Sequence, residues 1–295
     1  MSNELRGSTN MTENGSNYSV SFCLDFTNKR LRVEDYRYQG TMDCLYERVT
    51  QLAAHHGLTK VFFKAREEDW RILLAKGCML EGIYKGYFRG QDAFCMAVYF
   101  DLVRRNSDYW LEEDQLMRQV LALPRKPERP EVPEGLLLRM AGSSDAESLS
   151  ELYRQTFQTY PTPMNDSAYV AHTMEEGTIY YLVEVIEASE PKKHLISAAS
   201  AEMNATYANA EMTDCATLPT YRNRGLMRLL LHALEDELLS RGITCAYSLS
   251  RALSFGMNAA FYQMNYDYYG RLTKNCDIYD KFEDMNLWAK DLRHP

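Results

Sequence analysis

The stretch Arg222-Asn223-Arg224-Gly225-Leu226-Met227 decides the fold, because it joins a strand-like run at 211–218 to an amphipathic run at 226–239. The turn Pro219-Thr220-Tyr221 lies between them, and Arg241-Gly242 closes the second run. The first N–H groups of a helix have no partner inside it, and with the helix dipole they form an anion site. Gly225 lets the backbone approach a phosphate closely, and the two arginines add positive charge.

These six residues resemble the pyrophosphate-binding signature of the GNAT superfamily of N-acetyltransferases, Gln/Arg-x-x-Gly-x-Gly/Ala. Arg222 and Gly225 match, whereas Met227 stands where the family usually has Gly or Ala. The departure leaves the backbone donors available but suggests an altered approach to the pyrophosphate. The resemblance implies that the cofactor acetyl-CoA is bound by Arg222, Asn223, Arg224, Gly225, Leu226 and Met227.

A second signature follows in the expected order and separation. Residues 243–249 form a short, mostly apolar run that Gly242 bounds, which is typical of a buried strand. Ser254 then opens a predicted helix at 255–264, which ends at Asn265. The run from Asn258 to Tyr266 resembles the second GNAT signature, with Asn265 in place of the usual Gly.

Several further segments are similar to those of β-lysine N-acetyltransferases. They are the run 258–262, Tyr268-Tyr-Gly-Arg-Leu272, Asn275-Cys276, Phe282-Glu-Asp-Met-Asn-Leu-Trp288 and the hairpin Gly86-Tyr-Phe-Arg-Gly90. The resemblance implies a cytoplasmic enzyme that makes Nε-acetyl-β-lysine, a compatible solute used in osmoadaptation. The substrate assignment rests on this resemblance and not on residue spacing.

The composition excludes several classes of protein. The formal net charge of −8 argues against nucleic acid as a partner, because phosphate backbones need a basic surface. No apolar run is long enough for a membrane span, and the seven cysteines and six histidines show no metal-ligand spacing. We therefore expect reduced thiols, no metal, no membrane partner and a small-molecule amine substrate.

Four prolines, at 124, 127, 130 and 133, mark a predicted domain boundary, because such spacing favours an extended segment. The predicted regions are a disordered N-terminus (1–17), an α/β module (18–123), a linker (124–134) and a GNAT domain (135–295). In the first module we predict helices at 46–55 and 67–76, a strand at 58–63 and a hairpin of 79–87 with 92–100. This order favours a degenerate GNAT-like half that does not bind cofactor and serves packing or homodimerisation.

The C-terminal region has the GNAT order of elements. We predict strands at 136–140, 178–186, 194–206, 209–218, 243–249, 266–272 and 281–288. Helices are predicted at 144–157, opened by the capping-box pattern Ser144-Asp-Ala-Glu147, and at 167–176, 226–239 and 255–264. The fold class is therefore α/β, a mixed sheet with helices on both faces.

Acetyl transfer needs a base, because a lysine-type ammonium has a pKa of about 10.4. Glu211 is the predicted base, acting directly or through water, because glutamate-using members of the superfamily carry one at this position. The alternative is an ordinary strand glutamate, and Glu202 on the preceding strand is the reserve. Asp214 has the opposite parity to Glu211 and is expected on the other face of the sheet.

The remaining candidates also follow from the resemblance. Tyr262 is the predicted acid for the departing thiolate, with a packed core tyrosine as the alternative. Asn258 is expected to contact the cofactor, or else to cap its own helix. Backbone N–H groups near Thr217 and Leu218 are the predicted oxyanion donors, where two strands splay apart.

For the two ammonium groups and one carboxylate of β-lysine, the candidate contacts are Glu202, Arg251, Glu283, Asp284 and Asn286, each of which can equally be ordinary surface structure. Two alternative functions remain open. One is N-acetylation of another small amine, such as a polyamine or an amino acid. The other is a non-catalytic acyl-CoA-binding sensor.

Overall fold

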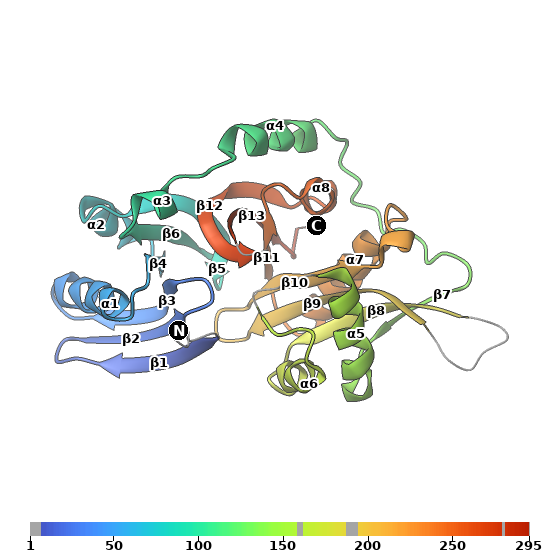
Figure 1. The fold of residues 1–295 in the computed structure, drawn as a ribbon, viewed down its shortest axis with the longest axis horizontal. Helices are drawn as coiled ribbons and strands as arrows, with labels where there is room; N and C mark the ends of the chain where they lie inside the picture. Colours follow the sequence, from blue (N-terminus) through green and yellow to red (C-terminus); the bar gives the residue numbers. More distant parts are fainter. Residues whose placement is uncertain (1–6, 158–161, 187–193, 279–280, 295) are drawn as a thin grey trace, which may run out of the picture.

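The computed structural model describes residues 7–157, 162–186, 194–278 and 281–294, and these form one continuous sheet of 13 strands flanked by helices (Figure 1). The strand order is β1-β2-β3-β4-β6-β5-β12-β13-β11-β10-β9-β8-β7. The strands are β1 (Ser8–Asn14), β2 (Tyr18–Asp25), β3 (Arg30–Tyr38), β4 (Lys60–Ala65), β5 (Met79–Phe88), β6 (Gln91–Tyr99), β7 (Leu136–Met140), β8 (Ile179–Val185), β9 (His194–Asn204), β10 (Asn209–Thr217), β11 (Cys245–Arg251), β12 (Asp267–Ile278) and β13 (Lys281–Asp291). The helices are α1 (Asp43–His55), α2 (Trp70–Ala75), α3 (Leu102–Arg105), α4 (Trp110–Leu121), α5 (Ala146–Thr156), α6 (Ser167–Glu175), α7 (Leu226–Ser240) and α8 (Phe255–Gln263).

The C-terminal half confirms the predicted mixed sheet with helices on both faces. Strands β10 and β11 are parallel and are joined by α7, while the other neighbours in this half pair antiparallel. Helices α5 and α7 both pack on β9 and β10, and Figure 1 shows them on opposite sides of these strands. A long stripe of buried leucines, from Leu226 to Leu238, fixes α7 on the sheet.

The N-terminal half repeats this order of elements. Antiparallel β1, β2 and β3 lead through α1 to β4, which is parallel to β3, and β6 of the β5–β6 hairpin then pairs with β4. In the C-terminal half, β8 to β10 lead through α7 to β11, and β13 of the β12–β13 hairpin pairs with β11. The topology agrees with the interpretation of residues before the linker as a GNAT-like half.

The two halves meet where β5 pairs antiparallel with β12, with Gly82 opposite Gly270. A Cβ atom on Gly270 would lie 2.3 Å from the Glu81 carbonyl oxygen and 2.5 Å from the Gly82 Cα, so only glycine fits there. Tyr84 and Tyr247 from the two halves also stack edge to face, with ring centroids 5.1 Å apart. The sheet and part of the core therefore continue across the two halves.

The expectation that residues 1–17 are disordered is wrong for much of that segment. Ser8–Asn14 form β1, which pairs with β2 along its whole length, from Ser8 opposite Asp25 to Asn14 opposite Ser19. The strand is an exposed edge made mostly of Ser, Thr and Asn, with Met11 and Glu13, so its composition is typical of a coil even though its backbone is paired. Residues 1–6 lie outside the described residues.

The proline segment is held against the C-terminal half. Arg228 donates to the Glu128 carbonyl oxygen at 2.8 Å, and Arg129 pairs with Asp236 at 2.6 Å. Helix α4, which precedes the segment, buries Met117 and Val120 in the C-terminal core. The structural boundary thus lies before α4, and the predicted boundary at 123 is displaced because α4 was not identified from the sequence.

Candidate active site

The start of α7 has the geometry that the sequence predicted for an anion site. Gly225 caps the helix with a φ of 76°, and Asn223 also has a left-handed φ of 62°. The first helical hydrogen bond runs from the Leu229 N–H to the Gly225 carbonyl at 3.1 Å, so the N–H groups of Leu226 and Met227 precede it. Residues 222–225 are exposed, and buried Leu226 anchors the turn.

The two arginines of the turn hold it in place and make it positive. The Arg222 Nε donates to the Thr217 carbonyl at 3.2 Å, and the Arg224 Nη2 donates to the Thr220 carbonyl at 3.2 Å. Among the described residues, and apart from its chain neighbours and its own helix backbone, no atom lies within 4 Å of a Cβ built on Gly225, so its left-handed φ is what requires glycine here. The space left open beside it is available to a phosphate group.

The equivalent helix start in the N-terminal half differs in chemistry. Helix α1 is capped by Met42, and its first turn contains Asp43, which pairs with Lys76. A carboxylate at this position repels a phosphate group. We therefore propose that the cofactor binds at α7 and not at α1.

Strands β10 and β11 separate as expected for a cofactor channel. Their parallel register covers only three pairs, Asn209–Cys245, Ala210–Ala246 and Glu211–Tyr247. Beyond these pairs β10 bulges at Asp214, which has a φ of 48°, and the register with β9 shifts between Thr213 and Ala216. The bulge turns β10 away from β11 and opens a strand edge to an extended ligand.

Of the two predicted oxyanion donors, one remains available. The Leu218 N–H donates to the Ile196 carbonyl at 2.9 Å and so is occupied by β9. Because N–H groups alternate in direction along a strand, the Thr217 N–H points toward the open β11 edge. The prediction for Leu218 is corrected for this reason, and Thr217 is retained.

The expectation that Asp214 lies on the other face from Glu211 is also wrong. The Asp214 carboxylate accepts a hydrogen bond from the Ser200 Oγ at 2.6 Å, and Ser200 is two residues from Glu202 on β9. Glu202 is paired directly with Glu211, so all four side chains share one face. The bulge breaks the simple alternation on which the parity argument rested.

Glu211 and Glu202 line a cavity of about 480 Å³ between the two halves of the chain. The N-terminal half contributes Asn10, Met11, Thr12, Ser21, Phe22, Arg32, Glu34, Lys64 and Tyr87, and the C-terminal half contributes Glu202, Met203, Asn204, Asn209, Glu211 and Tyr247. Burial and then the neighbouring Glu202 carboxyl raise the pKa of Glu211 to about 7. Glu202 is open to the cavity but surrounded by protein, and burial and then Asp214 raise its pKa to about 7.

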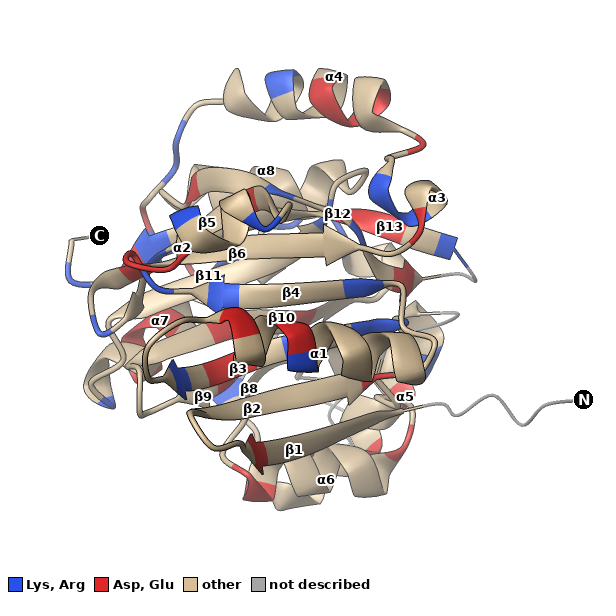
Figure 2. Ribbon diagram, turned by 90° about the vertical axis from the view of Figure 1, so that its left-hand side faces the viewer, with Lys and Arg blue, Asp and Glu red and all other residues tan. Residues whose placement is uncertain are grey.

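The opposite wall of this cavity carries three charged residues that the sequence reading missed. Arg32 lies 3.2 Å from Glu34, and Lys64 is hydrogen-bonded to the same carboxylate. Although burial opposes ionisation, Lys64 and Arg32 hold the pKa of Glu34 at about 2. Figure 2 shows the charged positions along β3 and β4. The alternation of charged residues with Leu31 and Val33 is the signal that predicts this strand.

The structure places the helix α8 candidates outside this cavity. Asn258 is fully buried; its Oδ1 accepts from Asn286 and Trp288 at 2.9 Å, and its Nδ2 donates to the Ser254 carbonyl at 2.7 Å. This side chain is saturated by protein, so we assign it a structural role in place of the expected cofactor contact. The Tyr262 hydroxyl donates to the Leu121 carbonyl at 3.0 Å, and its ring lies under Arg125.

The other substrate candidates are engaged elsewhere. Arg251 pairs with Glu283 at 2.7 Å, and neither lines the cavity with Glu211. Asp284 accepts from the Lys274 N–H at 2.7 Å, and Asn286 accepts from the Arg271 Nε at 3.0 Å. Of the predicted substrate contacts, only Glu202 meets Glu211 in one cavity.

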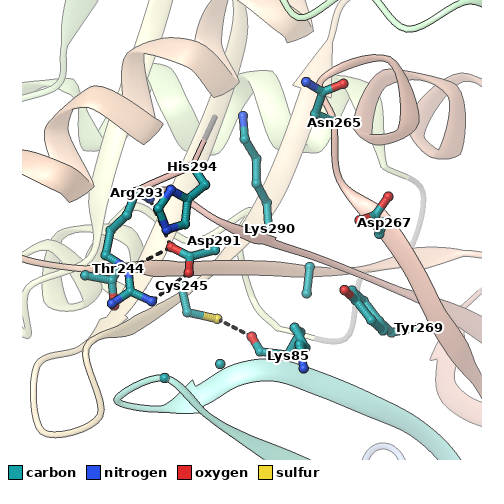
Figure 3. Close-up of a pocket in the computed structure, with 13 residues that line it drawn as sticks. Lys85, Thr244, Cys245, Asn265, Asp267, Tyr269, Lys290, Asp291, Arg293 and His294 are labelled. Carbon is teal, nitrogen blue, oxygen red and sulfur yellow. Dashed lines mark hydrogen bonds and ion pairs between the residues drawn. The ribbon is translucent and has the colours of Figure 1, made fainter.

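Figure 3 shows a second cavity, of about 260 Å³, near the start of β11 and the end of β13. There the Cys245 Sγ donates to the Lys85 carbonyl at 3.0 Å, and Arg293 pairs with Asp291 at 2.6 Å. Burial raises the pKa of the Cys245 thiol to about 12, so the thiol stays protonated. None of the candidate site residues lines this cavity.

Within the residues that the structure describes, no cluster of His, Cys, Asp or Glu is arranged to hold a metal ion. In the same residues, no helix is long and apolar enough to cross a membrane.

Comparison with known proteins identifies the family. The model of the acetyltransferase (GNAT) family matches residues 146–266. The chain is 38% identical to the N-acetyltransferase YodP of Bacillus subtilis over 268 residues, covering 91% of this chain and 94% of that one. The chain belongs to the GNAT family of N-acetyltransferases. It is an N-acetyltransferase that uses acetyl-CoA, and the residues at the start of α7 and the open edge of β10 fit this cofactor.

Two relatives of this GNAT enzyme carry a more specific name. It is 36% identical to the β-lysine N(6)-acetyltransferase of Methanosarcina mazei, covering 73% of this chain and 85% of that one. It is 31% identical to the protein of the same name from Methanococcus maripaludis, covering 83% of this chain and 87% of that one.

Proposed function

We propose that this enzyme acetylates the terminal amine of β-lysine to give Nε-acetyl-β-lysine, and that the product serves as a compatible solute in the cytoplasm. The observation that carries the proposal is the cavity at the open edge of β10, where Glu202 and Glu211 lie opposite Arg32 and Lys64. β-Lysine has two ammonium groups and one carboxylate, so it needs charges of both signs. The names of the two methanogen relatives support the same substrate.

Glu211 is the proposed base. It lies at the last paired position of β10 and β11, where the cavity meets the open strand edge. Its pKa, raised to about 7 by burial and then by Glu202, lies near neutral pH, where a general base is most effective. Glu202 is the proposed partner that attracts the incoming ammonium group and shares the proton of the pair.

The remaining roles follow the open edge toward α7. Acetyl-CoA supplies the activated acetyl group when its pyrophosphate is bound by the turn 222–227. The Thr217 N–H is the proposed donor to the acetyl carbonyl oxygen as that oxygen gains negative charge. Tyr262 is the proposed acid for the thiolate, and its hydroxyl must exchange the Leu121 carbonyl for the sulfur to act.

A thiol-release assay with acetyl-CoA against a panel of amines tests the substrate. The panel contains β-lysine, α-lysine, spermidine and a histone-like peptide. The highest kcat/KM is expected for β-lysine. A higher value for spermidine or the peptide refutes the substrate while leaving the acetyltransferase activity in place.

A further inference from the structure

We infer that the N-terminal half of the chain binds the carboxylate of the amine substrate through Arg32, so that the enzyme selects amines that carry a carboxylate. The identity of the amine rests on the proposed function, but the selection for a carboxylate does not. The inference gives the half without a cofactor site a direct part in substrate recognition.

The cavity is polar at both ends, and each end comes from a different half of the chain. Glu202 and Glu211 project from β9 and β10, while Arg32 and Lys64 project from β3 and β4. The two ends interact, because Lys64 and Arg32 both lower the pKa of Glu211 against the larger, opposing effect of burial. A small molecule in the cavity therefore contacts acidic groups at one end and basic groups at the other.

The basic end holds more positive than negative charge. Arg32 and Lys64 share the single carboxylate of Glu34, so these three residues together carry a net charge of about +1. Such a surplus in a partly buried site favours an anionic ligand group. The carboxylate is the only anionic group of a free lysine-type amino acid, whereas a polyamine has none.

Arg32 is better placed than Lys64 to take up this carboxylate. Its side chain is 33% exposed toward the cavity, while that of Lys64 is 11% exposed and hydrogen-bonded to Glu34. The Lys64 Nζ also lies 5.2 Å from the Tyr87 ring centroid, which holds it in place. The planar guanidinium matches the two oxygens of a carboxylate, which an ammonium group does not.

Strand β1 borders the same end of the cavity. Asn10, Met11 and Thr12 line it, and their strand is held by pairing with β2. A carboxylate bound by Arg32 therefore also lies beside the side chains of β1.

The experiment compares each amino acid with its decarboxylated analogue in wild-type enzyme and in Arg32→Gln. The pairs are β-lysine with 1,4-diaminopentane and α-lysine with cadaverine. We expect Arg32→Gln to lower kcat/KM for the better amino acid by about 10- to 100-fold, the usual effect of losing a charged hydrogen bond. The analogue should change by less than about 2-fold, because it makes no contact with the guanidinium.

Two further variants separate recognition from folding. Arg37→Gln removes an exposed arginine that lies on the same strand but outside the cavity, and it should leave kcat/KM for all four amines unchanged. Arg32→Lys keeps the charge and should recover part of the loss. Calorimetry with acetyl-CoA should give a wild-type Kd for each variant, since the cofactor site is on α7.

The possible outcomes are distinct. An equal loss for amino acid and analogue, or no loss for either, overturns the inference. If the wild-type enzyme does not acetylate β-lysine but acetylates α-lysine, the proposed substrate is refuted. The comparison of α-lysine with cadaverine then still tests the role of Arg32. A wild-type enzyme that prefers the decarboxylated member of both pairs refutes the selection for a carboxylate.

Discussion

Replacing Glu211 with Gln tests whether this carboxylate removes the proton from the substrate amine. Burial and then Glu202 raise its pKa to about 7, so the carboxyl ionises only as the pH rises through that value. Wild-type kcat/KM is therefore expected to climb with pH in this range. The Glu211→Gln variant has no base at this position and should lose that inflection.

The size of the effect follows from the amine. With a pKa of about 10.4, about 0.04% of a terminal amine is free at pH 7 and about 4% at pH 9. A positioned base contributes about 10²- to 10⁴-fold to the rate, so Glu211→Gln should be slower by that factor at pH 7. By pH 9 it should recover about 100-fold, because the fraction of free amine rises by that factor.

Thiol release from acetyl-CoA, measured with β-lysine from about pH 6 to about pH 9.5, gives both profiles. Glu202→Gln is the matched control: it keeps Glu211 but removes the like-charged neighbour, so the inflection should move below about 7. A Glu211→Gln enzyme with wild-type rates at neutral pH refutes the assignment. In that case Glu202 or a chain of water molecules accepts the proton.

Four other changes test the remaining features. Gly225→Ala should lower the free energy of unfolding by about 1–2 kcal/mol, because residue 225 has a φ of 76°, and it should also weaken acetyl-CoA binding. Gly225→Asn should keep the wild-type stability. If calorimetry gives the Ala variant an unchanged affinity for acetyl-CoA, the phosphate site is contradicted. Gly270→Ala should lower the free energy of chemical unfolding by about 2–4 kcal/mol. Gly256→Ala is the control and should not lower it, because a Cβ at position 256 contacts nothing within 4 Å. Equal stabilities of the two variants would mean that the contact with the Glu81 carbonyl is easily relieved. Tyr262→Phe should lower kcat by about 10-fold or more with little change in KM, and an unchanged kcat would leave Tyr262 only its contact with Leu121. Deletion of residues 1–14 should raise the KM for β-lysine and leave the Kd for acetyl-CoA unchanged; an unchanged KM argues against β1 as part of the cavity wall.

The backbone geometry of the turn before α7 could be predicted from the sequence, because its requirements are local. A residue with a left-handed φ before a helix is most easily a glycine, and Gly225 occupies this position. The feature can therefore be read from the six residues 222–227 alone. A β-branched Val at position 225 would strain the backbone at this left-handed φ, so Gly225→Val is expected to affect folding as well as binding. The strand and helix that follow are equally local in their patterns.

The proposed substrate cavity was not predictable in this way, because it depends on pairing between distant segments. Arg32 and Lys64 meet Glu211 only once the N-terminal sheet has joined the C-terminal one through β5 and β12. The polar edge strand β1 gives no hydrophobic signal. Asp214 was misplaced because a bulge adds one residue to β10, and no local feature of the sequence announces it.

The pairing of Gly82 with Gly270 has a consequence for the symmetry of the molecule. Strands β5 and β12 occupy the same place in the two halves and pair antiparallel, as two identical subunits do about a two-fold axis. One polypeptide thus reproduces the contact of a homodimer, and the strand edges used for it are no longer available to a second chain. In a true homodimer every substitution appears in both subunits, whereas here each half changes alone. One half can keep the proposed phosphate turn at Gly225, while the other carries Asp43 at the same helix start and lends its strands β1, β3 and β4 to the proposed substrate cavity. A symmetric pair of identical chains cannot build such a one-sided site.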